Sequence, residues 1–218
     1  MRPPATQLLL LGAVGLFGPV NGYQIRRELL SWQADRWANV KPGSIYHALG
    51  RLADEGLLRR HDLPEGTREV AVYEITEPGR RRLAEQLADA TREVDIFDDR
   101  AFHAAFGLLP LLGDAPALDH LDERRRRLAA AIDEFAPAAS PNPYVPPHAQ
   151  RGAQLWITRA RAELEWLTGV VDDLRSGELS FQPSSTWAPP ADDPGHQMTS
   201  DRSRYRALIA ERRSTTSE

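Results

Sequence analysis

The chain has 218 residues, of which 41% are hydrophobic and 27% charged, a composition that supports one or two globular domains and excludes a protein disordered throughout. It has no cysteine, which excludes disulfides and thiolate chemistry, and no apolar run of the roughly 18 residues that a membrane helix needs, so we expect a cytoplasmic protein without membrane contact. The net charge of −4 argues against general polyanion binding, but positions 1–90 hold 12 basic and 11 acidic residues, and such a segment can still gather a basic face.

Three helices are predicted in the first 55 residues, at 7–17, 22–32 and 42–55, from apolar residues at helical spacing. Asn21 is a good N-cap for the second helix, and Pro42 suits the first turn of the third, where an N–H would be unpaired. A signal peptide over the first apolar stretch is disfavoured because no small-residue cleavage site follows it.

Two strand-like segments come next, at 57–63 and 69–76, separated by residues of turn composition at 64–67. The second segment alternates, with Tyr73 on an inward face. Three helices followed by a β-hairpin predict a winged helix-turn-helix.

Heptad spacing dominates the rest of the chain. Apolar residues from 83 to 111 are separated by steps of four and three, with a break expected near Asp95, and the helices predicted at 116–135 and 153–176 keep this rhythm. The Pro-, Ser- and Asp-rich end of the chain is expected to be flexible, with a short charged helix near its end. The expected domains are a winged helix-turn-helix at 1–80, a helical dimerisation and effector domain at 81–181, and a tail at 182–218. The fold class is therefore mainly α with a small β-hairpin wing.

An ordered set of motifs resembles the PadR family of bacterial transcriptional regulators. The motifs are LLLLG at 8–12, NGYQI at 21–25, PGSIYHAL at 42–49, LADEGLL at 52–58 and YEITEPGR at 73–80. The resemblance is clear over roughly residues 5–85 and holds only in outline beyond them. It implies a homodimeric winged-helix repressor, of a kind often released from its operator by a phenolic acid or a drug. The sequence departs from the family at His47, where a proline is common, and in a short wing whose only basic residue is Arg68.

The outward side of the third predicted helix carries polar side chains that suit a DNA major groove. Arg51 can reach phosphate or a guanine edge, and Arg68 can enter a minor groove from the wing. Four alternatives stay open: Tyr46 packing under the wing, Tyr23 in the core, Arg51 as a surface charge and Ser44 as an ordinary helix residue. The candidate DNA-binding residues are Tyr23, Lys41, Gly43, Ser44, Tyr46, His47, Arg51 and Arg68.

Selective binding to double-stranded DNA calls for two heads about 34 Å apart, so we expect a homodimer formed through the heptad seams. The candidate dimerisation residues are Leu87, Val94, Phe97, Ala101, Leu108, Ile157, Leu164, Leu167 and Val171. Aromatic residues beside these seams could hold a small aromatic effector, with ordinary interface packing as the alternative. They are Phe97, Phe102, Trp156 and Trp166. The run Arg124–Arg127 is expected to be a solvated face or to form salt bridges between subunits.

An enzyme is not expected, because the sequence has no nucleophile elbow, phosphate-binding glycine loop or paired metal-binding histidines. No catalytic residue, cofactor or metal is expected, since Asp99 and His103 supply only one ligand pair. The predicted function is a DNA-binding transcriptional regulator, a homodimeric repressor relieved by a small molecule. The alternative is a winged-helix module that binds another protein and no operator. Neutralisation of Arg51 by Asp54, Glu55 or Glu65 would favour that alternative.

Overall fold

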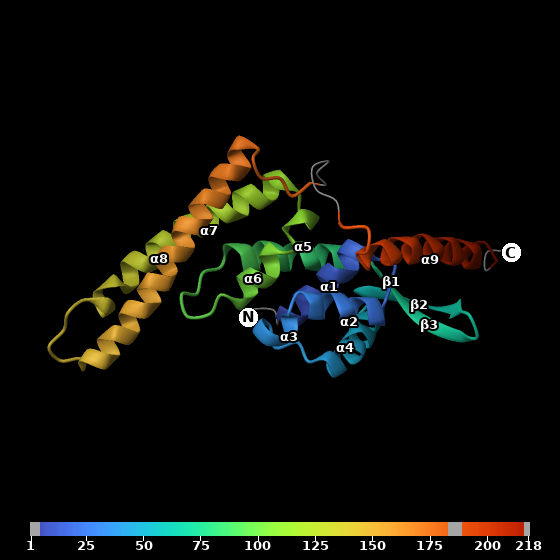
Figure 1. Cartoon of the computed structure of the whole chain (residues 1–218), viewed down its shortest axis with the longest axis horizontal. Helices are drawn as coiled ribbons and strands as arrows, with labels where there is room; N and C mark the ends of the chain where they lie inside the picture. Colours follow the sequence, from blue (N-terminus) through green and yellow to red (C-terminus); the bar gives the residue numbers. More distant parts are fainter. Residues whose placement is uncertain (1–4, 183–188, 216–218) are drawn as a thin grey trace. The chain divides into compact units, whose positions relative to one another are not determined.

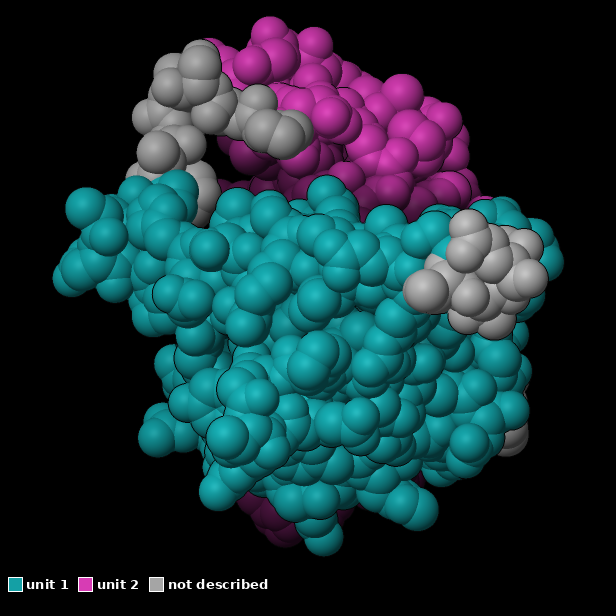
Figure 2. Space-filling view, turned by 90° about the vertical axis from the view of Figure 1, so that its right-hand side faces the viewer, with its two compact units in different colours: residues 1–86, 184–218 teal, residues 87–183 magenta. Residues whose placement is uncertain are grey.

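The computed structural model of the protein describes residues 5–182 and 189–215. The chain divides into two compact units (Figure 2). Unit 1 comprises residues 1–86 together with 184–218, and unit 2 comprises residues 87–183. Within the described ranges, no helix combines the length and the apolar character needed to cross a bilayer.

Unit 1 begins with a helix-turn-helix built around a buried first helix (Figure 1). All residues from Leu8 to Val14 are buried, which explains why this stretch is apolar on every side. The short α3 was not predicted, because four residues give no periodic signal. The helical elements are α1 (Ala5–Phe17), α2 (Gly22–Ser31), α3 (Ala34–Trp37), the 3-10 turn η1 (Pro42–Ser44) and α4 (Ile45–Asp54).

The start of α2 is fixed by a capping box. The Asn21 side-chain oxygen accepts a hydrogen bond of 2.8 Å from the Gln24 backbone N–H, and the Gln24 side-chain oxygen accepts one of 3.2 Å from the Asn21 N–H. Two N–H groups that the helix leaves unpaired are thereby satisfied. The predicted N-cap is confirmed.

A small antiparallel sheet completes the wing. Its strands are β1 (Val20–Asn21), β2 (Leu58–Glu65) and β3 (Arg68–Ile75), in the order β1-β3-β2. The predicted hairpin is confirmed, with Leu63 opposite Val70 and His61 opposite Val72. Tyr73 is 4% exposed, as expected for an inward residue. The mainly helical fold with a small β wing is therefore confirmed.

The rest of the helical part contains α5 (Glu77–Arg92), α6 (Arg100–Phe106), the 3-10 turn η2 (Leu109–Leu111), α7 (Asp114–Ala139) and α8 (Pro147–Ser176). The break expected near Asp95 lies between α5 and α6. Both α7 and α8 are longer than predicted, and α7 includes Pro137 near its end. They pack against each other over two apolar clusters, one centred on Leu121 and Leu167 and the other on Leu128 and Ile157.

One arginine of α7 does not lie where the sequence analysis expected it. Arg124 was expected on a solvated face or in a salt bridge between subunits, but it is buried, with 1% of its surface exposed. Arg124 is therefore neither on a solvated face nor available for a salt bridge between subunits. The following arginines do lie at the surface, where Arg126 and Arg127 pair with Glu123 at 2.7 Å.

The end of the chain differs most from its prediction. In place of a flexible tail with a short helix, residues Gly195–Thr215 form α9, a helix of 21 residues (red in Figure 1). This helix belongs to unit 1 and contacts α1, β1 and β2. Tyr205 is fully buried, and Ile209 is 3% exposed. The tail expected over 182–218 is thus corrected to an ordered helix over most of its described part.

Candidate nucleic-acid interface

The outward face of α4 is polar and accessible. Ile45 and Leu49 hold the inner side of the helix in the core, where each is at most 1% exposed. Ser44, His47 and Arg51 are all exposed. Because residues three and four apart lie on one side of a helix, these three side chains form a single row.

The entry to α4 leaves room for a close approach. The Ser44 hydroxyl donates a hydrogen bond of 2.8 Å to the Lys41 carbonyl, which closes the first turn and leaves its oxygen as an acceptor. A Cβ at Gly43 would meet no atom within 4 Å, so the backbone there borders open space. Lys41 is exposed beside it. A phosphate could therefore reach the backbone N–H groups at this end of the helix.

Two tyrosines lie where α2 meets α4. The Tyr46 ring packs on Gly22, where an added Cβ would be 2.9 Å from two ring carbons. It is 48% exposed, so it packs against the start of α2 and not beneath the wing. Tyr23 is 61% exposed and is therefore not a core residue. Both rings remain accessible to a partner.

Arg51 is not isolated from carboxylates. Its Nε lies 3.6 Å from a carboxylate oxygen of Glu55 one turn later, a pairing of the kind that favours the protein-partner alternative. However, the Arg51 and Glu55 side chains are 61% and 45% exposed, and such pairs are worth only about 0.3–0.5 kcal/mol. A DNA phosphate could compete for the guanidinium, so this weak pair favours the protein-partner alternative only slightly.

The wing presents Arg68 at its turn. Gly66 adopts a φ of +63°, a left-handed conformation that suits glycine, and Arg68 follows it at the start of β3. Its guanidinium is exposed and forms no ion pair with any residue the structure describes. Arg26, which was not among the candidate residues, is a partly exposed arginine three residues after Tyr23 on the same side of α2, so it borders the candidate interface. That spacing was the signal that could have found it.

Comparison with known proteins identifies the region that carries this surface. Residues 10–85 match the model described as "Transcriptional regulator PadR-like family". Unit 1 contains a PadR-like domain. The resemblance drawn from the motifs at 8–12, 21–25, 42–49, 52–58 and 73–80 is thus confirmed over these residues. No match was found among curated proteins.

Solved structures with PadR-like folds also resemble the chain. Bacillus subtilis PadR in complex with operator DNA is 21% identical, with 76% of this chain and 98% of that chain covered and a TM-score of 0.34. The same regulator in complex with p-coumaric acid is 18% identical, with 80% of this chain and 99% of that chain covered and a TM-score of 0.34. The PadR-like regulator BC1756 from Bacillus cereus is 17% identical, with 79% of this chain and 97% of that chain covered and a TM-score of 0.35.

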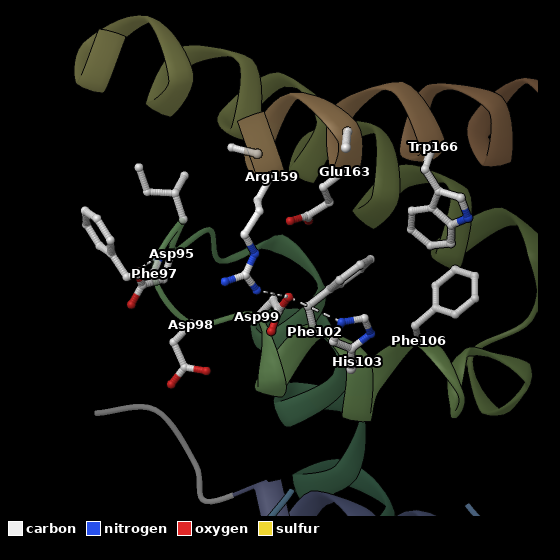
Figure 3. Close-up of a pocket in the computed structure, with 13 residues that line it drawn as sticks. Asp95, Phe97, Asp98, Asp99, Phe102, His103, Phe106, Arg159, Glu163 and Trp166 are labelled. Atoms are coloured by element: carbon white, nitrogen blue, oxygen red, sulfur yellow. Dashed lines mark hydrogen bonds and ion pairs between the residues drawn. The ribbon is translucent and has the colours of Figure 1, made fainter. Parts of the chain in front are cut away.

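Outside the PadR-like domain, unit 2 contains a cavity of about 360 Å³ with an aromatic lining (Figure 3). Three of the four predicted effector residues line it, namely Phe97, Phe102 and Trp166. Trp156 is not part of the lining but lies beside it, with its ring 5.3 Å from Phe97 in an edge contact. Phe106 also lines the cavity, 5.0 Å from the Trp166 ring.

Charged groups stand between these rings. Asp99 lies 3.4 Å from His103 and 3.8 Å from Arg159, so its carboxylate lies between these two side chains (Figure 3). Asp95, Asp98 and Glu163 also border the cavity. Within the described residues, no group of three or more potential metal ligands forms. Arginines lie against three of these carboxylates, Arg100 at Asp98, Arg159 at Asp99 and Arg124 at Glu163. The cavity therefore combines flat apolar walls with a border of paired charges.

Most of the expected dimerisation residues are already buried within one chain. Leu167 and Val171 pack in the cluster between α7 and α8, and Ile157 packs in the second cluster. Leu87 and Leu108 are each 1% exposed. Val94, Ala101 and Leu164 are half-buried, and Phe97 is 53% exposed. The heptad pattern could not distinguish a helical hairpin within a chain from a coiled coil between chains, because both need the same apolar seam.

Proposed function

We propose that this protein is a DNA-binding transcriptional regulator that recognises a specific operator through α4 and the wing of its PadR-like domain. The observation that carries this proposal is the row of Ser44, His47 and Arg51 on the exposed face of α4. Short and flexible polar side chains on an exposed helix suit the major groove. The proposed role is that of a repressor in the bacterial cytoplasm.

A homodimer is part of the proposal. One winged helix contacts a short half-site, so selective binding needs two heads on adjacent half-sites. The exposed apolar side chains of unit 2 supply a surface for association. Phe97 is 53%, Leu155 59% and Trp166 46% exposed, and burial of such large apolar side chains in an interface would favour association.

The cavity of unit 2 is the proposed site for a small aromatic effector. Its volume lies in the range of ligand pockets, and rings such as Phe102, Phe106 and Trp166 can stack on a planar molecule. Since three of the carboxylates at its border are paired with arginines, a neutral aromatic compound fits better than a charged one. Binding there would relieve repression by favouring a conformation that holds the two heads off the operator.

Genomic footprinting with the purified protein tests DNA recognition, with the promoter of its own gene as the first candidate. We expect a palindromic site, whose affinity in gel shifts falls at least tenfold for a His47→Ala/Arg51→Ala double variant. The matched control is Arg161→Ala on α8, an exposed arginine far along the chain from α4. Binding that is equal on all sequences, or unaffected by the double variant, would reject the operator proposal and favour the protein-partner alternative.

Two further measurements address the dimer and the effector. Sedimentation at micromolar concentration should show a dimer, and Leu155→Glu should shift it toward monomer. Titration with a neutral, a cationic and an anionic aromatic dye should quench tryptophan fluorescence most strongly for the neutral dye, and Trp166→Ala should weaken that binding. A monomeric wild type, or quenching that does not depend on Trp166, would contradict the corresponding part.

A further inference from the structure

We propose that α9 is a working part of the DNA-reading head, because it holds the wing in place against the start of the helix-turn-helix, with Tyr205 as the positioning residue. This inference rests on the proposed function for its effect on DNA. The sequence placed α9 in a tail, and the match to the PadR-like family ends at residue 85. The helix therefore lies outside the residues that match the family.

The wing hairpin has an apolar face that α9 covers. Leu63 of β2 and Val72 of β3 are fully buried in one cluster with Tyr205 and Ile209 of α9. Val70 packs against the same cluster. Since neighbouring residues of a strand point to opposite faces, this is the face that Tyr73 does not use. A two-stranded hairpin is only marginally stable alone, so covering this face should restrict its motion.

One hydroxyl joins the wing to the helix-turn-helix. The Tyr205 hydroxyl accepts a hydrogen bond of 2.9 Å from the side-chain amide of Asn21 and donates one of 3.2 Å to a carboxylate oxygen of Glu65. Asn21 is the N-cap of α2, and Glu65 is the last residue of β2, next to the wing turn. The hydroxyl therefore forms a bridge between the start of α2 and the tip of the wing.

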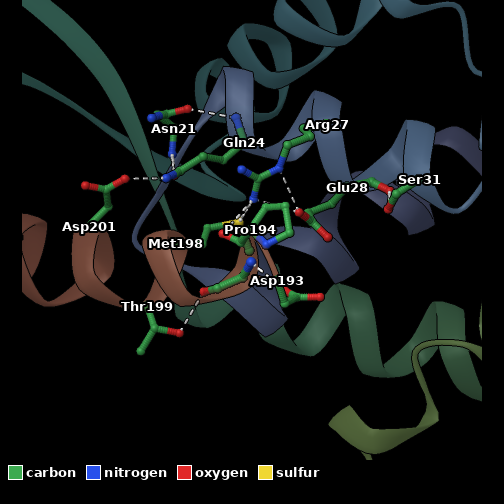
Figure 4. A network of polar contacts seen from close by, with 11 residues as sticks. Asn21, Gln24, Arg27, Glu28, Ser31, Asp193, Pro194, Met198, Thr199 and Asp201 are labelled. Carbon is green, nitrogen blue, oxygen red and sulfur yellow. Dashed lines mark hydrogen bonds and ion pairs between the residues drawn. The ribbon is translucent and has the colours of Figure 1, made fainter. Parts of the chain in front are cut away.

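The same helix contacts the ends of α1 and α2. Arg202 donates hydrogen bonds of 2.8 and 2.9 Å to the carbonyls of Leu16 and Gly18, which the end of α1 leaves without helical partners. Gln24 of the capping box donates one of 2.8 Å to Asp201 (Figure 4). Contacts with α1, α2 and the hairpin at once explain how α9 can fix their relative positions.

Further polar contacts run along the hairpin. Arg204 lies 2.9 Å from Glu65, and Arg213 lies 3.3 Å from Glu74. The first pair is at the turn and the second is near the base of the wing, so the contacts span its length. Arg68, three residues after Glu65, depends on this segment for its position. A change at Tyr205 should therefore weaken the contact of the wing with DNA. It should leave the contacts made by Ser44, His47 and Arg51 of α4 unchanged.

The contacts of α9 with the wing and with α1 and α2 form what we call the brace. Hydrogen exchange of the full-length protein tests this brace without DNA. Tyr205→Phe keeps the ring and removes only the bridge, and we expect amide exchange in β2 and β3 to speed up about fivefold, the effect of one net hydrogen bond. Tyr205→Ala should give a larger increase in the same strands. The control is Tyr144→Ala, because Tyr144 is 93% exposed in unit 2. Hairpin exchange equal to wild type in the Phe variant would overturn the brace, even if the Ala variant does not fold.

Binding to the operator found by footprinting tests the effect on DNA. Tyr205→Phe should weaken binding about three- to tenfold, and it should add little to Arg68→Ala because both act through the wing. Faster hairpin exchange with unchanged operator affinity would overturn the role in DNA reading. A wild type that binds no operator would reject the proposed function and with it this role, whereas the brace would still be judged by the exchange data.

Discussion

Arg124 of α7 donates two hydrogen bonds to the same carboxylate oxygen of Glu163 on α8, at 2.9 and 2.6 Å. Its guanidinium also bonds to the Glu93 carbonyl and lies 3.8 Å from the centre of the Phe102 ring. The arginine side chain is 2% exposed, so protein groups and not water compensate its charge. They also connect α7 and α8 to the wall of the cavity, since Phe102 and Glu163 both line it.

Removing one partner of this buried pair should destabilise unit 2 strongly. Arg124→Ala leaves Glu163 without its cation and opens a cavity, and we expect a loss of about 3–5 kcal/mol in the free energy of unfolding. Urea denaturation followed by circular dichroism measures it. Arg126→Ala is the control, because Arg126 is 63% exposed and its pair with Glu123 should contribute at most about 1 kcal/mol. Equal effects of the two changes would contradict this account of Arg124.

Gly79, in the first turn of α5, is expected to tolerate no side chain. A Cβ there would lie 2.0 Å from the Leu57 carbonyl oxygen, a backbone atom that cannot rotate away. Gly79→Ala should therefore lower the free energy of unfolding by about 2 kcal/mol or more. Gly50→Ala is the matched control in α4, where a Cβ meets nothing within 4 Å. Because alanine favours a helix over glycine, that variant should gain about 0.5–1 kcal/mol in thermal or urea unfolding.

The sequence predicted the PadR-like domain well because its signals are local. The apolar period of α1, the Asn21 cap and the alternation around Val72 each depend on neighbouring residues. The end of the chain offered no such signal. Its buried residues Tyr205 and Ile209 are few and stand among arginines, and they became recognisable as core only through contacts with Leu63, more than 140 residues away.

The candidate interface could be predicted only in part for the same reason. Exposure of Ser44, His47 and Arg51 follows from helical spacing, which the sequence contains. The contact of Tyr46 with Gly22 depends on how α2 crosses α4, and no spacing shows it. Likewise, heptads predicted apolar seams but not whether Leu167 would meet its own chain or a second one.

His120 should make unit 2 less stable as the pH falls below neutral. Burial, assisted by the nearby Arg92, lowers the pKa of His120 from its usual value. Because the folded pKa lies below the unfolded one, the stability linked to this group is fully present above about pH 6.5 and is lost as the pH falls through the folded pKa. Urea unfolding between about pH 7.5 and 5.5 should show this loss in the wild type, and His120→Gln should reduce it.

The exposed His148 provides the control for that experiment, since His148→Gln should keep the wild-type pH dependence.

The carboxylate of Glu123 in the same unit should not contribute to that pH dependence. Hydrogen bonds from Arg127 and Arg126 lower the pKa of Glu123. The stability linked to that carboxylate is therefore lost only at more acidic pH, below its ordinary range near 4, and does not overlap the histidine window. A pH profile that is the same with and without His120 would show that another group is responsible.

Arg51 and Arg68 should each contribute one phosphate contact per head. Each contact releases condensed counterions, so Arg51→Ala or Arg68→Ala should weaken operator binding and reduce the slope of log affinity against log salt by about one unit per head. Fluorescence anisotropy at several salt concentrations measures both quantities. Glu55→Gln adds a test with the opposite sign, because it removes the carboxylate 3.6 Å from Arg51 and should strengthen binding if that guanidinium meets DNA. An unchanged slope in Arg51→Ala, together with no gain in Glu55→Gln, would assign Arg51 to the surface pair and leave the DNA contact to other residues of α4.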